Sequence, residues 1–170
     1  MYTVLQVVAV ALVSVAMALS LAHALEFPGK MRLDKETYYG MQSIYYPGFT
    51  IGGGVGEGGG TIATVILLFL TPSGSGQFWL TLSALLCLLA VQAVYWIFTH
   101  PVNNFWVAGE KLDRFSSSFF SFGTKRSRKG AGQRDWTQLR DRWEYSHVAR
   151  AALSATSFVL LLVATASGAA

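Results

Sequence analysis

Long uncharged apolar runs alternate along the chain with short segments that hold almost all of its charges. Residues 2–25, 78–98 and 151–170 contain no charged side chain. Each run is long enough to cross a hydrocarbon core of about 30 Å as a helix. A fourth run opens with glycines around Glu57 and continues as an apolar stretch. The pattern predicts membrane spans at residues 2–25, 49–71, 78–99 and 147–168.

Four such helices satisfy the hydrogen bonds of every backbone group internally, which a membrane requires. The pattern therefore predicts an all-α fold, a polytopic membrane four-helix bundle, with residues 1–170 as a single membrane domain. The composition agrees, since 52% of the residues are hydrophobic and only 13% are charged, about half the usual charged share. These values exclude a soluble domain and a disordered chain. The single cysteine, Cys87, excludes a disulfide framework.

The basic residues predict the topology. All thirteen Lys and Arg residues fall within residues 30–35 and 111–150. The positive-inside rule places both segments in the cytoplasm and both termini on the non-cytoplasmic side of a bacterial-type inner (plasma) membrane. These basic segments are expected to contact membrane lipids and not nucleic acid. Ala22-His23-Ala24 resembles a signal-peptidase site, but no Lys or Arg precedes the apolar run, so we predict that it is retained as the first helix.

The segment between the third and fourth spans, residues 101–145, is too long for a simple connector. Its phenylalanines alternate with serines from residue 115 to residue 122, a pattern typical of a stretch that lies in the membrane interface. We therefore predict a cytoplasmic interfacial segment there, followed by a basic loop. Residues 135–150 are predicted to be helical and to lead into the fourth span without a break.

Polar side chains gather at the predicted cytoplasmic ends of the spans. The three histidines end the first and third spans and begin the fourth: His23, His100 and His147. Two of them have a carboxylate three residues away on the same helix face, Glu26 and Glu144. The second span carries Glu57 about 12 Å from its start, at 1.5 Å per residue. A carboxylate at that depth must be buried in protein or paired.

Three interpretations of this cluster remain open from the residue pattern. The first is a site for a transition metal (iron, copper or zinc), because imidazole and carboxylate groups are its usual ligands; the candidates are His23, His100, His147, Glu26 and Glu57. The second is metal-free acid–base chemistry, in which a histidine removes a proton from an acidic carbon or a phenol. The third is structural, with histidines at helix ends and carboxylates facing water. Tyr45, Tyr46 and Trp96 are expected to line a substrate pocket nearby.

Two short elements carry a family resemblance. His100-Pro101-Val-Asn103-Asn104 follows the third span, and Trp143-Glu-Tyr-Ser-His147-Val-Ala-Arg150 opens the fourth. Together they resemble the Pro-x-Asn and Trp-x-x-x-His-x-x-Arg elements of the four-span anthrone oxygenase-like family. The resemblance implies oxidation of an anthrone to an anthraquinone by molecular oxygen without an added cofactor. It also implies that His147 is the base, with Asn103 or Arg150 steadying the oxyanion and Trp143 completing the motif.

Other segments are not elements of the polyketide enzymes of that family, namely residues 23–30, 45–48 and the basic insertion 123–134. They favour a different branch with another substrate. We therefore expect an oxygenase-like enzyme acting on a lipophilic, electron-rich aromatic or quinol-type small molecule near the cytoplasmic interface.

The alternative is a non-catalytic accessory subunit of a larger membrane complex. Gly52, Gly56 and Gly60 form a row of small residues at every fourth position. Such a row permits close helix packing, and it could serve for docking to partner membrane subunits or to a second copy of the chain. The same glycines could instead unwind the helix around a ligand.

Overall fold

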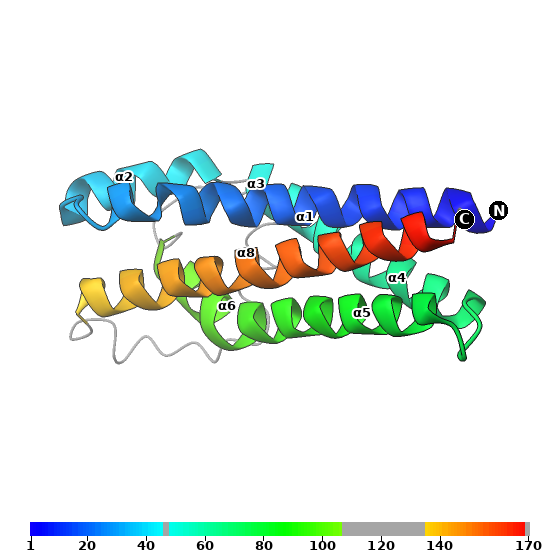
Figure 1. Cartoon of the computed structure of the whole chain (residues 1–170). Coiled ribbons are helices and arrows are strands. Elements are labelled where there is room, and N and C mark those ends of the chain that lie inside the picture. The colour runs from blue at the N-terminus through cyan, green and yellow to red at the C-terminus, as the bar shows by residue number, and fades with distance from the viewer. Residues whose placement is uncertain (46–47, 107–134, 169–170) are drawn as a thin grey trace.

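The computed structural model describes residues 1–45, 48–106 and 135–168 of the 170-residue chain. Every regular element in these ranges is helical. Four stretches are long and apolar enough to cross a membrane: Tyr2–Lys30, Gly48–Leu70, Gly76–Asn103 and Trp136–Ser167. They lie side by side as one elongated bundle (Figure 1). The predicted all-α bundle with four membrane spans is confirmed, whereas the predicted interfacial stretch falls within residues 107–134, outside the described residues.

The helices of the four spans differ in their regularity. The first span is α1 (Tyr2–Lys30), which is followed by the short α2 (Lys35–Tyr45). The second span consists of α3 (Gly48–Gly53), a π-helical turn η1 (Gly54–Gly59) and α4 (Gly60–Leu70). The third consists of α5 (Gly76–Val94), a second π-helical turn η2 (Tyr95–Thr99) and α6 (His100–Trp106). The fourth is the long α8 (Trp136–Ser167).

Helices α1 and α8 both extend past the spans predicted at residues 2–25 and 147–168. Helix α1 continues to Lys30, and α8 begins at Trp136, directly after Asp135, whose carboxylate accepts a hydrogen bond of 3.0 Å from the backbone N–H of Thr137. The continuous helix predicted from residue 135 into the fourth span is confirmed. The difference arises because hydropathy marks where apolar residues stop, whereas the polar residues beyond are buried and paired within the bundle.

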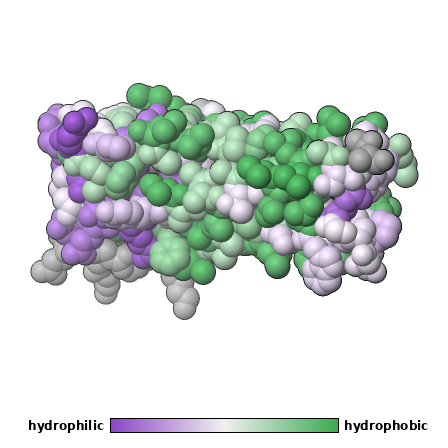
Figure 2. Space-filling model, viewed as in Figure 1, coloured by the Kyte–Doolittle hydropathy of each residue, from purple (hydrophilic) through white to green (hydrophobic). Residues whose placement is uncertain are grey.

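An apolar core joins the spans, and an apolar surface surrounds them. The core cluster draws its buried residues from α1, α4, α5 and α8: Ala9, Val13, Ala63, Leu67, Ala84, Leu88 and Leu161. Hydrophobic residues cover the middle of the outer surface, and hydrophilic residues concentrate at the end where α2 lies (Figure 2). We call this end, formed by the last turns of α1, by α2 and by the first turns of α8, the polar end. A second cluster, from Tyr38 to Trp143, packs α2 there against α6 and α8.

The row of small residues in the second span packs against α1. A Cβ atom added at Gly56 would lie 2.8 Å from the backbone nitrogen of Ala16, and one added at Gly60 would lie 3.0 Å from the side chain of Val13. Of the two interpretations of this row, the close packing of helices is therefore confirmed, and the packing partner is α1 of the same chain.

Candidate active site

A cavity of about 200 Å³ lies between the spans, toward the polar end. All four spans and α2 contribute to its wall. The polar lining residues are Ser20, His23, Thr50, Glu57, Gln92, Thr99, Asn103, His147 and Arg150, and the aromatic ones are Tyr45, Phe49, Tyr95, Trp96 and Trp143. The two π-helical turns, η1 and η2, both border it. Such turns interrupt the regular helix and are frequent at functional sites.

Glu57 and Arg150 form a buried ion pair in the cavity wall. The pair joins the second span to α8, and the two residues are 7% and 6% exposed. Gln92 of α5 also donates to Glu57, at 3.3 Å from Nε2 to Oε2. The guanidinium carbon of Arg150 lies 5.2 Å from the ring centre of Tyr95. The carboxylate within the membrane is therefore both buried and paired, as its depth requires.

The second contact of Arg150 fixes the role of each nitrogen of His147. Its Nη1 lies 3.3 Å from Nδ1 of His147. A guanidinium can only donate, so Nδ1 accepts and the ring proton of neutral His147 sits on Nε2. This Nε2 is buried and has no hydrogen-bond partner among the described residues. His147, a residue of the cavity wall, therefore carries an N–H group that the described residues leave unsatisfied.

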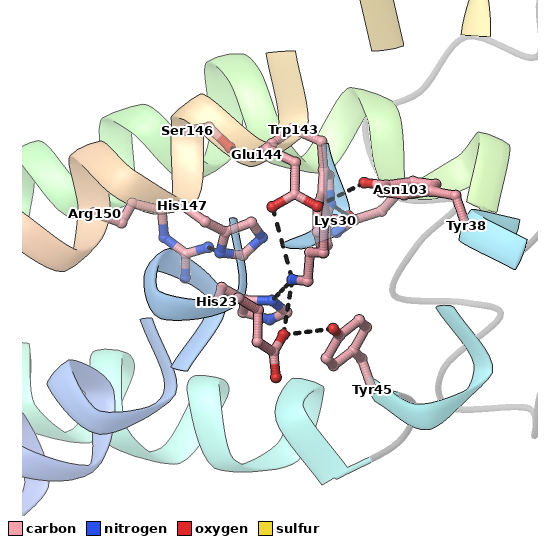
Figure 3. Close-up of polar contacts among 11 residues, drawn as sticks. His23, Lys30, Tyr38, Tyr45, Asn103, Trp143, Glu144, Ser146, His147 and Arg150 are labelled. Atoms are coloured by element: carbon pink, nitrogen blue, oxygen red, sulfur yellow. Dashed lines mark hydrogen bonds and ion pairs between the residues drawn. The ribbon is translucent and has the colours of Figure 1, made fainter. Parts of the chain in front are cut away.

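His23 is held in the same way by a second cation. Nζ of Lys30 lies 3.0 Å from Nδ1 of His23, 2.9 Å from the Glu26 carboxylate and 3.7 Å from the Glu144 carboxylate. An ammonium group is also only a donor, so Nδ1 of His23 accepts. Figure 3 shows Lys30 reaching between the helices toward His23 and Glu144.

Two tyrosines of α2 complete the network around Lys30. Tyr38 donates to Glu144 at 2.8 Å, and Tyr45 donates to Glu26 at 2.6 Å. Burial is the largest cause that raises the pKa of Tyr38 above its ordinary value of 10.0, and the neighbouring Glu144 carboxylate adds to it. Burial and the bond to Glu26 likewise raise the pKa of Tyr45. Both hydroxyls therefore stay protonated and act as donors.

The aromatic rings of the site are closely packed. The imidazoles of His23 and His147 lie 4.1 Å apart between ring centres, and the indole of Trp143 lies 4.3 Å from His147. The indole N–H of Trp143 donates to Oδ1 of Asn103 at 2.7 Å. This bond fixes the plane of the indole ring against which His147 packs. The four residues of the resemblance motif are thus in one place.

The structure brings most of the predicted site residues together, but not all. His23, Glu57, His147 and Arg150 line the cavity with Asn103 and Trp143, and so do two of the expected pocket residues, Tyr45 and Trp96. The third, Tyr46, lies outside the described residues. Glu26 bonds to Tyr45 and Lys30 behind the cavity wall. His100 is at the polar end but turns toward Tyr95, whose hydroxyl is 3.4 Å from its Nδ1.

The predicted metal site is not formed by the side chains proposed for it. Among residues 1–45, 48–106 and 135–168, no group of three or more His, Cys, Asp or Glu side chains is placed to hold a metal ion. The histidines that do meet have Lys30 and Arg150 against their Nδ1 atoms, and two buried cations repel a third. His23, His100, His147, Glu26 and Glu57 therefore do not fit a metal as a set, and no step below passes through one.

Sequence reasoning missed Lys30 and Gln92 as residues of the site. Lys30 was interpreted as a topological charge, although it follows His23 by seven residues, two helical turns, and so shares its face. Gln92 is an uncharged polar residue within an apolar span, which is itself a signal of an inward-facing contact. The third interpretation, in which the carboxylates face water, does not hold for Glu144, which is 0% exposed.

Comparison with known families identifies the class of protein. The family model described as anthrone oxygenase matches residues 49–160. This match covers more than half of the chain and includes the motif residues Asn103, Trp143, His147 and Arg150. No curated protein and no solved structure matches the chain. Together with the four apolar spans, the match shows that the chain is a member of the anthrone oxygenase family.

Proposed function

We propose that this chain is a multi-pass inner-membrane oxygenase-like enzyme that acts on a lipophilic, electron-rich phenol or quinol-type aromatic near the cytoplasmic interface. The observation that carries the proposal is the N–H group of His147, which is buried in the cavity wall with no partner among the described residues. An unsatisfied buried donor costs about 1–3 kcal/mol. A ligand oxygen in the cavity would remove that cost.

The size and lining of the cavity favour a compact aromatic ligand. An engineered apolar cavity of about 150 Å³ is enough to bind benzene, so about 200 Å³ suits one or two fused rings. Phe49, Trp96 and Trp143 supply flat apolar surfaces, against which aromatic rings pack favourably. A three-ring anthrone would need the cavity to widen, which supports the expectation of another substrate.

The polar groups support a division of roles. His147 donates its Nε2–H to the substrate oxygen, where negative charge develops, and Arg150 holds the ring in that tautomer. Glu57 is a carboxylate in the same wall and serves as the acceptor of the substrate proton. Asn103 and Trp143 position the imidazole. This assignment moves the base, which the family resemblance placed at His147, to Glu57.

The reaction balances with molecular oxygen as the only oxidant. Glu57 takes one proton from an activated methylene group, which in a phenol is the ring carbon para to the oxygen in the keto tautomer, and the carbanion's electron pair forms a bond to oxygen. The peroxide anion takes up a proton; loss of the second C–H proton and of hydroxide then gives a carbonyl group and water. Of the two oxygen atoms, one enters the product and one leaves as water.

The accessory-subunit alternative loses one of its supports. The row of Gly52, Gly56 and Gly60 packs against α1 and so offers no docking surface to a partner subunit. The basic segment between the third and fourth spans could also serve for docking to a partner, and it lies mostly within residues 107–134, outside the described residues.

The test is oxygen consumption by the protein in lipid nanodiscs, supplied with one- and two-ring phenols and methylene compounds. With ¹⁸O₂, we expect one labelled atom in the product and one in water. His147→Phe and Glu57→Gln should each abolish turnover, while His100→Phe, a matched change outside the cavity wall, should not. No consumption with any compound, or equal rates in all three variants, would overturn the proposal.

A further inference from the structure

The glycines of the second span fall on two faces with different surroundings. Added Cβ atoms at Gly52, Gly56 and Gly60 would meet α1 within 2.8 to 3.0 Å. At Gly53, Gly54 and Gly58, an added Cβ would meet nothing within 4 Å, and all three of these glycines line the cavity. The first face serves helix packing. The second keeps space open beside Glu57.

This open face lies on the side of the cavity toward the membrane. Gly54 is exposed, and Gly53 and Gly58 are half-buried. Trp96 of η2 also lines the cavity and is 41% exposed. Turn η1 belongs to the second span and packs against α1, whereas η2 belongs to the third span and packs against α8. The two turns therefore border the cavity from two neighbouring spans, since α4 and α5 pack together. The cavity extends between them.

The surface around this gap is apolar. Ile51 and Val55, on the glycine side, are 56% and 57% exposed, and Ile97, on the side of Trp96, is 56% exposed. All of them lie within stretches that are long and apolar enough to cross a membrane. In a bilayer, exposed apolar side chains on a membrane-spanning helix contact the lipid tails. The residues around the gap are therefore of the kind that faces hydrocarbon in a membrane-spanning helix.

A second observation shows that this gap leads to a ligand site. His147, which is 6% exposed, presents its unpartnered Nε2 in the wall of the same cavity. The cavity wall has no side chains at Gly53, Gly54 and Gly58, and it includes His147 with its unsatisfied donor. This combination leaves room for a ligand and a group that can bind it. Packing alone does not require glycine at these positions, because an added Cβ would meet nothing within 4 Å and Ala is a better helix former than Gly.

We infer that the gap between η1 and η2, bordered by Gly53, Gly54, Gly58 and Trp96, is a lateral opening. Through it a one- or two-ring aromatic that is dissolved in the bilayer reaches His147 and Glu57. The inference rests on the proposed function for the nature of the ligand and adds its route. It makes the three glycines determinants of access, with no part in the chemical step.

The test measures ligand entry without turnover. The probe is 6-bromo-2-naphthol, a two-ring phenol whose bromine quenches tryptophan fluorescence, added to the full chain in phosphatidylcholine nanodiscs in a stopped-flow instrument. Trp143 is left as the only tryptophan of every chain compared by the changes Trp79→Phe, Trp96→Phe, Trp106→Phe and Trp136→Phe, so that its quenching reports arrival in the cavity. Gly54→Leu and Gly58→Leu narrow the opening. Gly40→Leu on α2 is the matched control, since a Cβ there also meets nothing within 4 Å and Gly40 does not line the cavity.

We expect both cavity variants to bind and release the probe about tenfold more slowly, which corresponds to about 1.4 kcal/mol of added barrier, with a smaller change in Kd. The control should match the unaltered chain, and the rate should follow the mole fraction of probe in the bilayer. Unchanged rates in Gly54→Leu and Gly58→Leu, a rate that follows only the aqueous concentration, or no quenching of Trp143 would overturn the inference. If the probe enters Gly54→Leu and Gly58→Leu more slowly but the unaltered chain consumes no oxygen, the lateral opening is supported and only the proposed function is refuted.

Discussion

The ion pair between Glu57 and Arg150 allows a quantitative prediction of bundle stability. Arg150→Met removes the cation and leaves Glu57 buried at 7% exposure without its counter-charge. Breaking one side of a buried pair costs about 3–5 kcal/mol. The lost contact to Nδ1 of His147 adds about 1 kcal/mol. We therefore expect Arg150→Met to lower the free energy of unfolding by about 4–6 kcal/mol.

The double variant Glu57→Gln/Arg150→Met separates pairing from packing. Neutral side chains of similar size at both positions carry no buried charge, so the double variant should be more stable than Arg150→Met alone. The resulting coupling energy should be about 2–4 kcal/mol. The measurement is reversible unfolding by SDS in mixed micelles, followed by tryptophan fluorescence, for the unaltered chain, both single variants and the double variant.

Arg140→Met is the matched control on the same helix. Arg140 pairs at 2.8 Å with Asp141, whose side chain is 42% exposed. Such a pair contributes about 1 kcal/mol or less. A coupling energy for Glu57 and Arg150 as small as this would refute the reasoning, because it would mean that water screens both groups. Water would then enter the cavity and could bond to Nε2 of His147, so the argument that this group is unsatisfied would fail.

Three further predictions concern other parts of the bundle. Lys30→Met should lower the free energy of unfolding by about 3–5 kcal/mol in the same SDS assay, because it leaves the fully buried Glu144 without its counter-charge. A loss below about 1 kcal/mol would contradict a buried network around Lys30. Gly56→Leu should destabilise the bundle by at least about 1–3 kcal/mol through its clash with α1, whereas Gly58→Leu should not. Equal losses in the two variants would contradict the assignment of Gly56 to the packed face and of Gly58 to the open face. Since the pKa of Tyr38 is raised above 10.0, the unfolded chain loses this proton first, so stability is fully present below pH 10 and falls as the pH rises above it. In Tyr38→Phe the slope of stability against pH above pH 10 should be shallower by up to about 1.4 kcal/mol per pH unit, and an unchanged slope would argue against a buried hydroxyl.

The features that follow from local pattern could be predicted from the sequence. Runs of apolar residues locate the spans, and the alternating direction of successive spans places His23 and His147 at one end, where the structure brings their rings to 4.1 Å. The position of Glu57 deep within the second span predicted that its carboxylate is buried in protein or paired. The partner proved to be Arg150, for which the family resemblance implies a different role, that of steadying the oxyanion.

The remaining features depend on helix phase, which hydropathy does not encode. His100 was expected beside the other histidines, but it follows the π-helical turn η2. A π-helical turn bonds residue i to i+5 and so shifts the face on which later residues lie. Lys30 reaches His23 only because α1 remains helical past the apolar run. The position of His100 has no signature in residue spacing, whereas the seven-residue spacing of His23 and Lys30 indicates a shared face only if α1 continues to Lys30.

The two parts of the chain contribute differently to the site. The family match begins at residue 49, and the matched part supplies Glu57, His147 and Arg150, which carry the proposed proton handling. Residues before it supply the facing wall with His23 and Tyr45. Because His23 and Tyr45 line the same cavity as these groups, under the proposed function changes at these two positions should alter which aromatic is accepted while the reaction type is kept.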